Sequence, residues 1–226
     1  MGHSAQPSAG RGGNRRIRRS AFTYVSERRV PVGPSASGDL IAAHSMSEHL
    51  KAHKEGTLYF CTLTVVGWAD VFTRARNAQV ILESLAFCQG NKGLELFAYC
   101  LMPSHLHLIA RVQLGRLSDV LRDFKSFTAK RLLDLIANEP GESRKEWLMR
   151  LFREAAQGTK QNQDLMFWQK SMYPIEITHP AMYDQKVGYI HNNPVNEGLV
   201  TLPEHYAWSS AHPESPLKVF DHDAHS

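Results

Sequence analysis

The segment LELFAYCLMPSHLHLIARV, at positions 94–112, decides the fold because it places two apolar segments on either side of a tight turn. Residues 94–102 and 105–112 have the length and the aliphatic and aromatic content of strands. Pro103 and Ser104 leave room only for a short connection between them. We therefore predict an antiparallel β-hairpin at the centre of the folded part.

The segments that flank this hairpin complete an α+β pattern. Apolar residues at helical spacing predict helices, and a Pro-limited apolar segment near the C-terminal third predicts an edge strand. The order strand, helix, hairpin, helix, insert, strand, helix is typical of a ferredoxin-like antiparallel sheet with helices on one face. The flanking elements that we expect are a strand at 57–66, helices at 75–89, 117–137, 145–156 and 181–193, and a short strand at 172–180.

The positive charge of the chain is unevenly distributed. The net charge is +4, but residues 1–46 carry seven arginines and only two acidic residues. Residues 47–226 hold 19 basic and 20 acidic residues, so bulk charge does not indicate nucleic-acid binding for the folded part. We expect residues 1–46 to form a disordered basic arm that contacts phosphates. The alternative is that translation starts at Met46. We expect the folded domain to span 47–212 and a flexible tail to span 213–226.

The remaining composition points to a cytoplasmic protein. A hydrophobic content of 42% is enough for a core, and no apolar segment approaches the roughly 18 residues that span a bilayer. The three cysteines show no CxxC spacing, so we expect free thiols in a reducing compartment.

Two histidines, His105 and His107, lie two residues apart on the second strand of the hairpin. Alternation along a strand puts both imidazoles on one face, where they could bind one cation, and we expect that face to be the more open one because Leu108 points the other way. With 12 histidines in the chain, an HxH pattern also arises by chance, so the pair needs partners.

The segment YIHNNPVNEGLV, at 189–200, supplies candidate partners. Tyr189 and Asn193 are four residues apart, which places them on one helical face, whereas His191 points away from it. A phenolate is a competent nucleophile, and an amide oxygen can complete a metal shell or orient a phosphate. The alternative is an ordinary half-buried core tyrosine. Pro194 predicts that the helix ends at Asn193.

Five segments taken in order resemble the REP-associated tyrosine transposases and their relatives, the single-tyrosine HUH transposases. The resemblance covers about 57–212. It departs in the N-terminal arm and in Ser104, where relatives frequently carry Asn or Glu, a change that we expect to affect only the turn. The segments are YCLMPSHLHLIARV, LSDVLRDFKSFTAKRL, FWQKSMYPIEI, YIHNNPVNEGLV and PEHYAWSSA.

The resemblance implies an HUH-type endonuclease fold and a transposase-like nuclease and strand transferase that acts on hairpin-containing single-stranded DNA. It implies that Tyr189 is the nucleophile of a 5′-phosphotyrosine intermediate and that His105, His107 and Asn193 bind the metal. The residue types alone favour zinc, whereas the resemblance implies Mg²⁺ or Mn²⁺. Relatives occur as monomers and as homodimers that exchange the tyrosine helix, and we expect association with the nucleoid during the reaction.

Basic residues on the polar side of the 117–137 helix are candidates for DNA contacts: Arg122, Lys125, Lys130 and Arg131. The alternative is a solvated helix face. Trp168 could stack on bases extruded from a hairpin.

Three other functions compete with this interpretation. A domesticated, non-catalytic protein could bind structured single-stranded DNA, but all four candidate site residues are present. A relaxase or replication initiator would normally carry further ligands or a helicase part. A generic metallohydrolase would need a carboxylate near the histidine pair, and the sequence has none there.

Overall fold

The computed structural model describes residues 54–157, 164–170 and 172–221, all within one compact unit that spans Ala43–Ser226. The predicted basic arm at 1–46 lies outside the described residues. No helix in the described part of the chain is long and apolar enough to cross a membrane.

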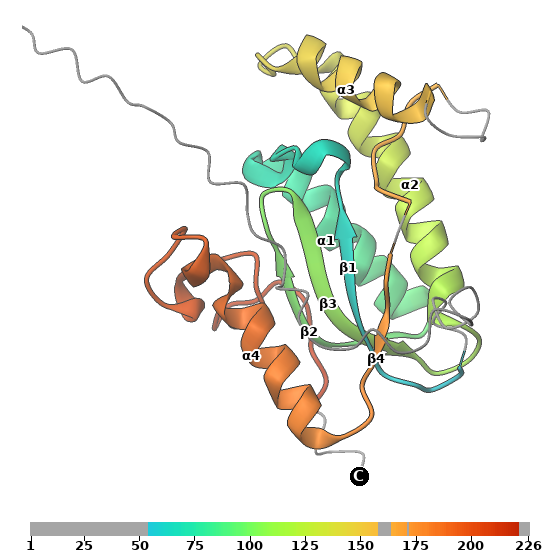
Figure 1. The fold of residues 1–226 in the computed structure, drawn as a ribbon, viewed down its shortest axis with the longest axis vertical. Coiled ribbons are helices and arrows are strands. Elements are labelled where there is room, and N and C mark those ends of the chain that lie inside the picture. The colour runs from blue at the N-terminus through green and yellow to red at the C-terminus, as the bar shows by residue number, and fades with distance from the viewer. Residues whose placement is uncertain (1–53, 158–163, 171, 222–226) are drawn as a thin grey trace, which may run out of the picture. The chain divides into compact units, whose positions relative to one another are not determined.

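The predicted hairpin forms one side of a four-stranded antiparallel sheet, with its first strand at the edge (Figure 1). Strands β2 (Leu94–Leu101) and β3 (His105–Val112) pair with each other, and β1 (Tyr59–Thr64) pairs with the other side of β3. The two-residue strand β4 (Ile175–Glu176) pairs with β1 at the edge, where Pro174 predicted it. The strand order is therefore β2-β3-β1-β4.

Within the described residues four α-helices accompany the sheet, and the α+β class is confirmed. Each predicted helix is present within a few residues of its expected ends. The helices are α1 (Ala75–Asn91), α2 (Leu117–Asn138), α3 (Lys145–Gln157) and α4 (Pro180–Asn196), and short 3-10 turns lie at Val66–Trp68, Val71–Thr73 and Pro203–His205.

Alternation along the strands gives the sheet two different faces. Leu106 and Leu108 of β3 are fully buried in the larger core, which α1 and α2 cover. On the opposite face Phe60, Phe97 and Ile109 form a second apolar cluster with Ile190 of α4. The expectation of helices on one face is therefore corrected: the second face is itself apolar, so it has to be covered by a helix as well (Figure 1).

Helix α4 also continues further than the sequence predicts. Pro194 was expected to end it at Asn193, but the helix runs to Asn196 with Pro194 buried inside. Proline removes one backbone donor without forbidding the turns that follow. As a result, Asn193 has helical turns on both sides.

The segment that follows α4 is bound to the outer edge of β2. The amide of Ser210 donates to the carbonyl of Tyr99 (2.9 Å), and the amide of Phe220 donates to the carbonyl of Leu96 (2.7 Å). Leu217 is buried in the larger core. The predicted flexible tail from 213 is thus wrong up to residue 221, because Leu217 and Phe220 supply apolar area that a free tail would leave in water.

Candidate active site

His105 and His107 lie at the start of β3, directly opposite Thr64 and Thr62 of β1. Their rings share one face of the sheet, with centroids 4.6 Å apart and planes at 78°. Both side chains are buried, at 8% and 4% exposure, because α4 lies over them. The predicted common face is correct, but the expectation that this face is open is not.

A hydroxyl group orients each imidazole. Thr62 Oγ1 lies 2.8 Å from His107 Nδ1, and Ser104 Oγ lies 3.0 Å from His105 Nδ1. An imidazole whose Nδ1–H donates to such a hydroxyl presents the lone pair of Nε2 for coordination. Ser104, which was expected to affect only the turn, therefore contacts a site residue directly.

Burial keeps both imidazoles neutral near pH 7. It lowers the pKa of His105 to about 4, against an opposing effect of the Asn193 side chain. Burial likewise lowers the pKa of His107 to about 3, and the positive charges of His105 and Lys186 lower it further. The neutral form is the one that binds a metal ion.

Helix α4 brings Tyr189 and Asn193 of the same chain to the histidine pair. The Tyr189 ring meets the His107 ring edge-on, with centroids 5.2 Å apart. Asn193 is buried one turn further along the helix, beside His105. Tyr189 remains 46% exposed, so its phenol is accessible from solvent. The predicted spacing of four residues thus places both groups at one site.

Two buried polar atoms at this site, His107 Nε2 and Asn193 Oδ1, have no hydrogen-bond partner within the described residues. Buried polar atoms are normally paired, so two such atoms together call for a ligand. A divalent cation fits them, because an imidazole nitrogen and an amide oxygen both offer lone pairs. No group of three His, Cys, Asp or Glu gathers anywhere in the described part, so the third protein donor would be the amide of Asn193.

Phe60 and Lys186 complete the wall of the site, and the sequence did not reveal them. Phe60 stacks on His107 (5.6 Å, 22°) and meets Tyr189 edge-on (5.9 Å). The Lys186 ammonium lies 4.9 Å from the centre of the Phe60 ring, one turn before Tyr189 on α4. The signal for Lys186 was its spacing of three residues from Tyr189.

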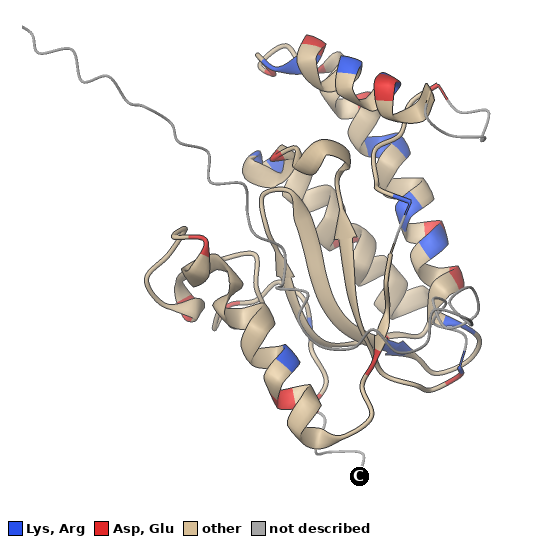
Figure 2. Ribbon diagram, in the orientation of Figure 1, with Lys and Arg blue, Asp and Glu red and all other residues tan. Residues whose placement is uncertain are grey.

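Three of the predicted DNA-binding residues, Arg122, Lys125 and Lys130, line one groove of about 760 Å³ between α2 and residues 165–170 and 172. Figure 2 shows basic residues, coloured blue, spaced along α2. Lys125 is less available for DNA phosphates than Lys130, because its ammonium donates to the carbonyl of Gln169 (2.8 Å) and burial lowers its pKa.

Trp168, predicted to stack on bases, lines the same groove but is 4% exposed. Its Nε1 donates to Thr128 Oγ1 (3.0 Å), and its ring packs against Phe72 and Phe167. The indole therefore belongs to the core. Sequence alone does not separate a core tryptophan from a surface one, since both carry the same apolar ring.

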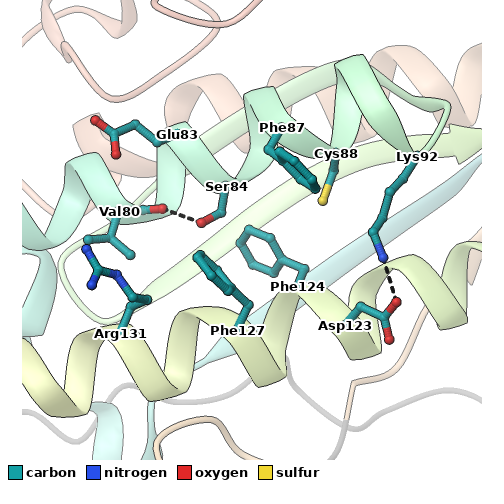
Figure 3. A pocket seen from close by; sticks show the side chains of 10 residues that line it. All are labelled: Val80, Glu83, Ser84, Phe87, Cys88, Lys92, Asp123, Phe124, Phe127 and Arg131. Atoms are coloured by element: carbon teal, nitrogen blue, oxygen red, sulfur yellow. Dashed lines mark hydrogen bonds and ion pairs between the residues drawn. The ribbon is translucent and has the colours of Figure 1, made fainter.

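Arg131 does not join the other basic residues. It lines a separate groove of about 430 Å³ between α1 and α2, into which Phe87 and Phe127 point (Figure 3). The ion pair between Lys92 and Asp123 closes one end of this groove (2.6 Å). The predicted row of four basic residues is therefore divided between two sides of α2.

Comparison with known proteins gives a fold match. No protein-family model matches the chain, and no match was found among curated proteins. One similar solved structure is that of a REP-associated tyrosine transposase bound to a REP hairpin, with 19% identity, a TM-score of 0.53, and coverage of 78% of this chain and 89% of that one. Another, from Deinococcus radiodurans R1, is described as a candidate transposase (20% identity, TM-score 0.36, 60% and 88% covered). The chain therefore has the fold of a REP-associated tyrosine transposase, in agreement with the family that its motifs resemble.

Proposed function

We propose that this protein cuts and rejoins single-stranded DNA through Tyr189. The phenol oxygen bonds to phosphorus while the bond from phosphorus to the 3′ oxygen breaks, which leaves a 5′-phosphotyrosine and a free 3′-hydroxyl. A 3′-hydroxyl then attacks the phosphotyrosine and releases Tyr189. Each step exchanges one phosphodiester for another, so no external energy source is needed.

The observation that carries the proposal is the contact of the Tyr189 ring with the His107 ring, at a site where His107 Nε2 and Asn193 Oδ1 are buried without a partner among the described residues. These atoms, with His105, would hold Mg²⁺ or Mn²⁺, which when bound stabilises negative charge on the phosphate. The chain's own contribution is orientation: Thr62 and Ser104 fix the imidazoles, and Phe60 shields one side from water.

The groove beside α2 supports a structured strand as the substrate. Lys130 offers charge for phosphates there, whereas the guanidinium of Arg122 is paired with Asp119 and Asp123. Gln169 joins the groove to the site, because its amide donates to the carbonyl of Thr64 (2.8 Å), and Thr64 pairs with His105. Because the histidine pair lies on the other face of the sheet, DNA held in the groove would pass around the edge beside Thr64 and Gln169 to reach it. The hairpin bound to the similar solved structure makes a hairpin-containing strand the first substrate to test.

The experiment uses labelled single strands with a hairpin, in Mg²⁺ or Mn²⁺, and measures an SDS-resistant protein–DNA adduct. We expect an adduct with the fragment that carries the 5′ phosphate, and mass spectrometry should locate it at Tyr189. Tyr189→Phe should abolish the adduct and retain DNA binding. Tyr173→Phe is the matched control, because Tyr173 is also an exposed tyrosine (62%) and lies outside the helix that carries Tyr189 and Asn193.

Two outcomes would contradict the proposal. An undiminished adduct in Tyr189→Phe would exclude Tyr189 as the nucleophile. Tight hairpin binding by the wild-type protein, with no adduct over a broad panel of strands and both metals, would favour the alternative of a non-catalytic DNA-binding protein.

A further inference from the structure

The turn between β1 and α1 holds an unusual backbone at Gly67 and Trp68. Both residues are in the left-handed region, with φ of 63° and 54°. Trp68 is the only non-glycine residue with positive φ in the described part of the chain. This conformation is unfavourable for a bulky L-residue, and it persists only where the surroundings impose it.

Contacts on both sides impose that conformation. The amide of Val65 donates to the carbonyl of Ser104, and the amide of Val66 donates to the carbonyl of Phe167, both at 2.9 Å. A side chain on Gly67 would come within about 3 Å of Leu151 of α3, so the turn is packed closely from that direction too. Trp68 is therefore presented on a rigid support.

Packing does not explain why a tryptophan stands there. Its side chain is 58% exposed, and burial of apolar area is the usual reason for a large aromatic residue. The exposed ring lies beside the active site, with its centroid 5.3 Å from that of His105 and the planes at 74°. An exposed, rigidly held indole next to a candidate phosphate site has the features of a stacking surface.

We propose that Trp68 is the stacking platform for a nucleobase next to the scissile phosphate of single-stranded DNA. The inference rests on the proposed function, because the phosphate is taken to lie at the histidine pair. A base on the same strand, one nucleotide from that phosphate, would lie against the free face of the indole. Stacking accepts any base, so Trp68 would contribute affinity and alignment and little sequence preference.

Binding assays test this in the Tyr189→Phe background, where no covalent step occurs. Trp68→Ala should weaken binding of a short single strand roughly 5- to 100-fold, the range expected for loss of one base–aromatic stack. Trp68→Tyr should restore most of it. Phe87→Ala is the control, because Phe87 is also an exposed aromatic residue (57%) but lies on α1, which covers the opposite face of the sheet, and it should bind as the parent does.

A stability measurement separates stacking from a structural role. Trp68→Gly should unfold at the same or a higher urea concentration, because glycine accepts positive φ freely, and should still lose DNA affinity. A parallel loss of stability and affinity in this variant would overturn the proposal. Binding within twofold of the parent in Trp68→Ala would overturn it as well.

A fluorescence assay tests the stacking by Trp68 independently of DNA cleavage by Tyr189. Single-stranded DNA should quench the tryptophan emission of the Tyr189→Phe protein, and Trp68→Tyr should remove most of that quenching. Quenching through Trp68 without any adduct in the wild-type protein would support the platform and contradict the transferase. An adduct that forms equally well in Trp68→Ala would support the transferase and contradict the stacking platform.

Discussion

The two faces of the sheet differ in how their buried side chains are packed and hydrogen-bonded. On β3, Leu106 and Leu108 point into the core under α1 and α2 and are fully buried among apolar neighbours. Their neighbours His105 and His107 point under α4, where a nitrogen of His107 and an oxygen of Asn193 are buried with no partner in the part of the chain that the structure describes. One face is built for stability, whereas the other keeps polar atoms that only a ligand would pair.

The largest expected effect comes from substituting two adjacent residues of β3, one on each face of the sheet, and comparing the two variants. Leu108→Ala should lower the free energy of unfolding by about 2–5 kcal/mol, because it leaves a cavity in the larger core, while the folded protein still forms the Tyr189 adduct. His107→Leu should abolish the adduct and change the unfolding free energy of the metal-free protein by less than about 1 kcal/mol, because it removes an unpaired buried atom.

Urea denaturation and the adduct assay measure the two quantities independently. If His107→Leu instead destabilised the metal-free protein as strongly as Leu108→Ala, the two faces would be equivalent and the contrast between them would fail.

The second effect is a pH dependence confined to the histidine face. The unfolded histidines bind a proton below about pH 6.5, whereas the folded ones stay neutral until about pH 4 for His105 and about pH 3 for His107. The unfolded state therefore binds more protons in this window, and stability is lost as the pH falls from 6.5 towards 4. We expect a loss on the order of 3 kcal/mol from each of the two histidines in metal-free protein.

Denaturation curves at a series of pH values give this slope. His107→Leu should remove about half of it, because His105 remains, and His205→Gln, at an exposed position, is the control. An unchanged slope in His107→Leu would mean that other groups cause the acid sensitivity.

The smallest effect concerns the hydroxyl beneath His107. Thr62→Val keeps the shape of the side chain but removes the contact with Nδ1, so the imidazole loses its fixed tautomer. Manganese affinity should fall about 10- to 100-fold, as for other groups that orient metal ligands. Thr73→Val makes the same change at an exposed position and should leave affinity unaltered; calorimetric titration with Mn²⁺ compares the two. Equal affinities would show that Thr62 does not orient the site.

The parts of this site that could be predicted are those set by local periodicity. A spacing of two on a strand placed His105 with His107, and a spacing of four on a helix placed Tyr189 with Asn193. The contributions of Thr62, Phe60 and Trp68 depend on which residues face each other across β1 and β3 and on a strained turn, and no local pattern reports those. Trp168 was misplaced for the same reason, since its hydrogen bond with Thr128 joins segments 40 residues apart.

The segment bound along β2 has a consequence beyond covering apolar area. An uncovered outer strand presents a row of free amides and carbonyls to which a strand of another molecule can add. Here the chain occupies those groups itself, and His191 Nε2 lies 2.9 Å from Ser210 Oγ, which attaches α4 to the same segment. Protection against self-association and placement of the tyrosine helix thus depend on one stretch of chain, so a truncation before Ser209 should cause aggregation and inactivation together.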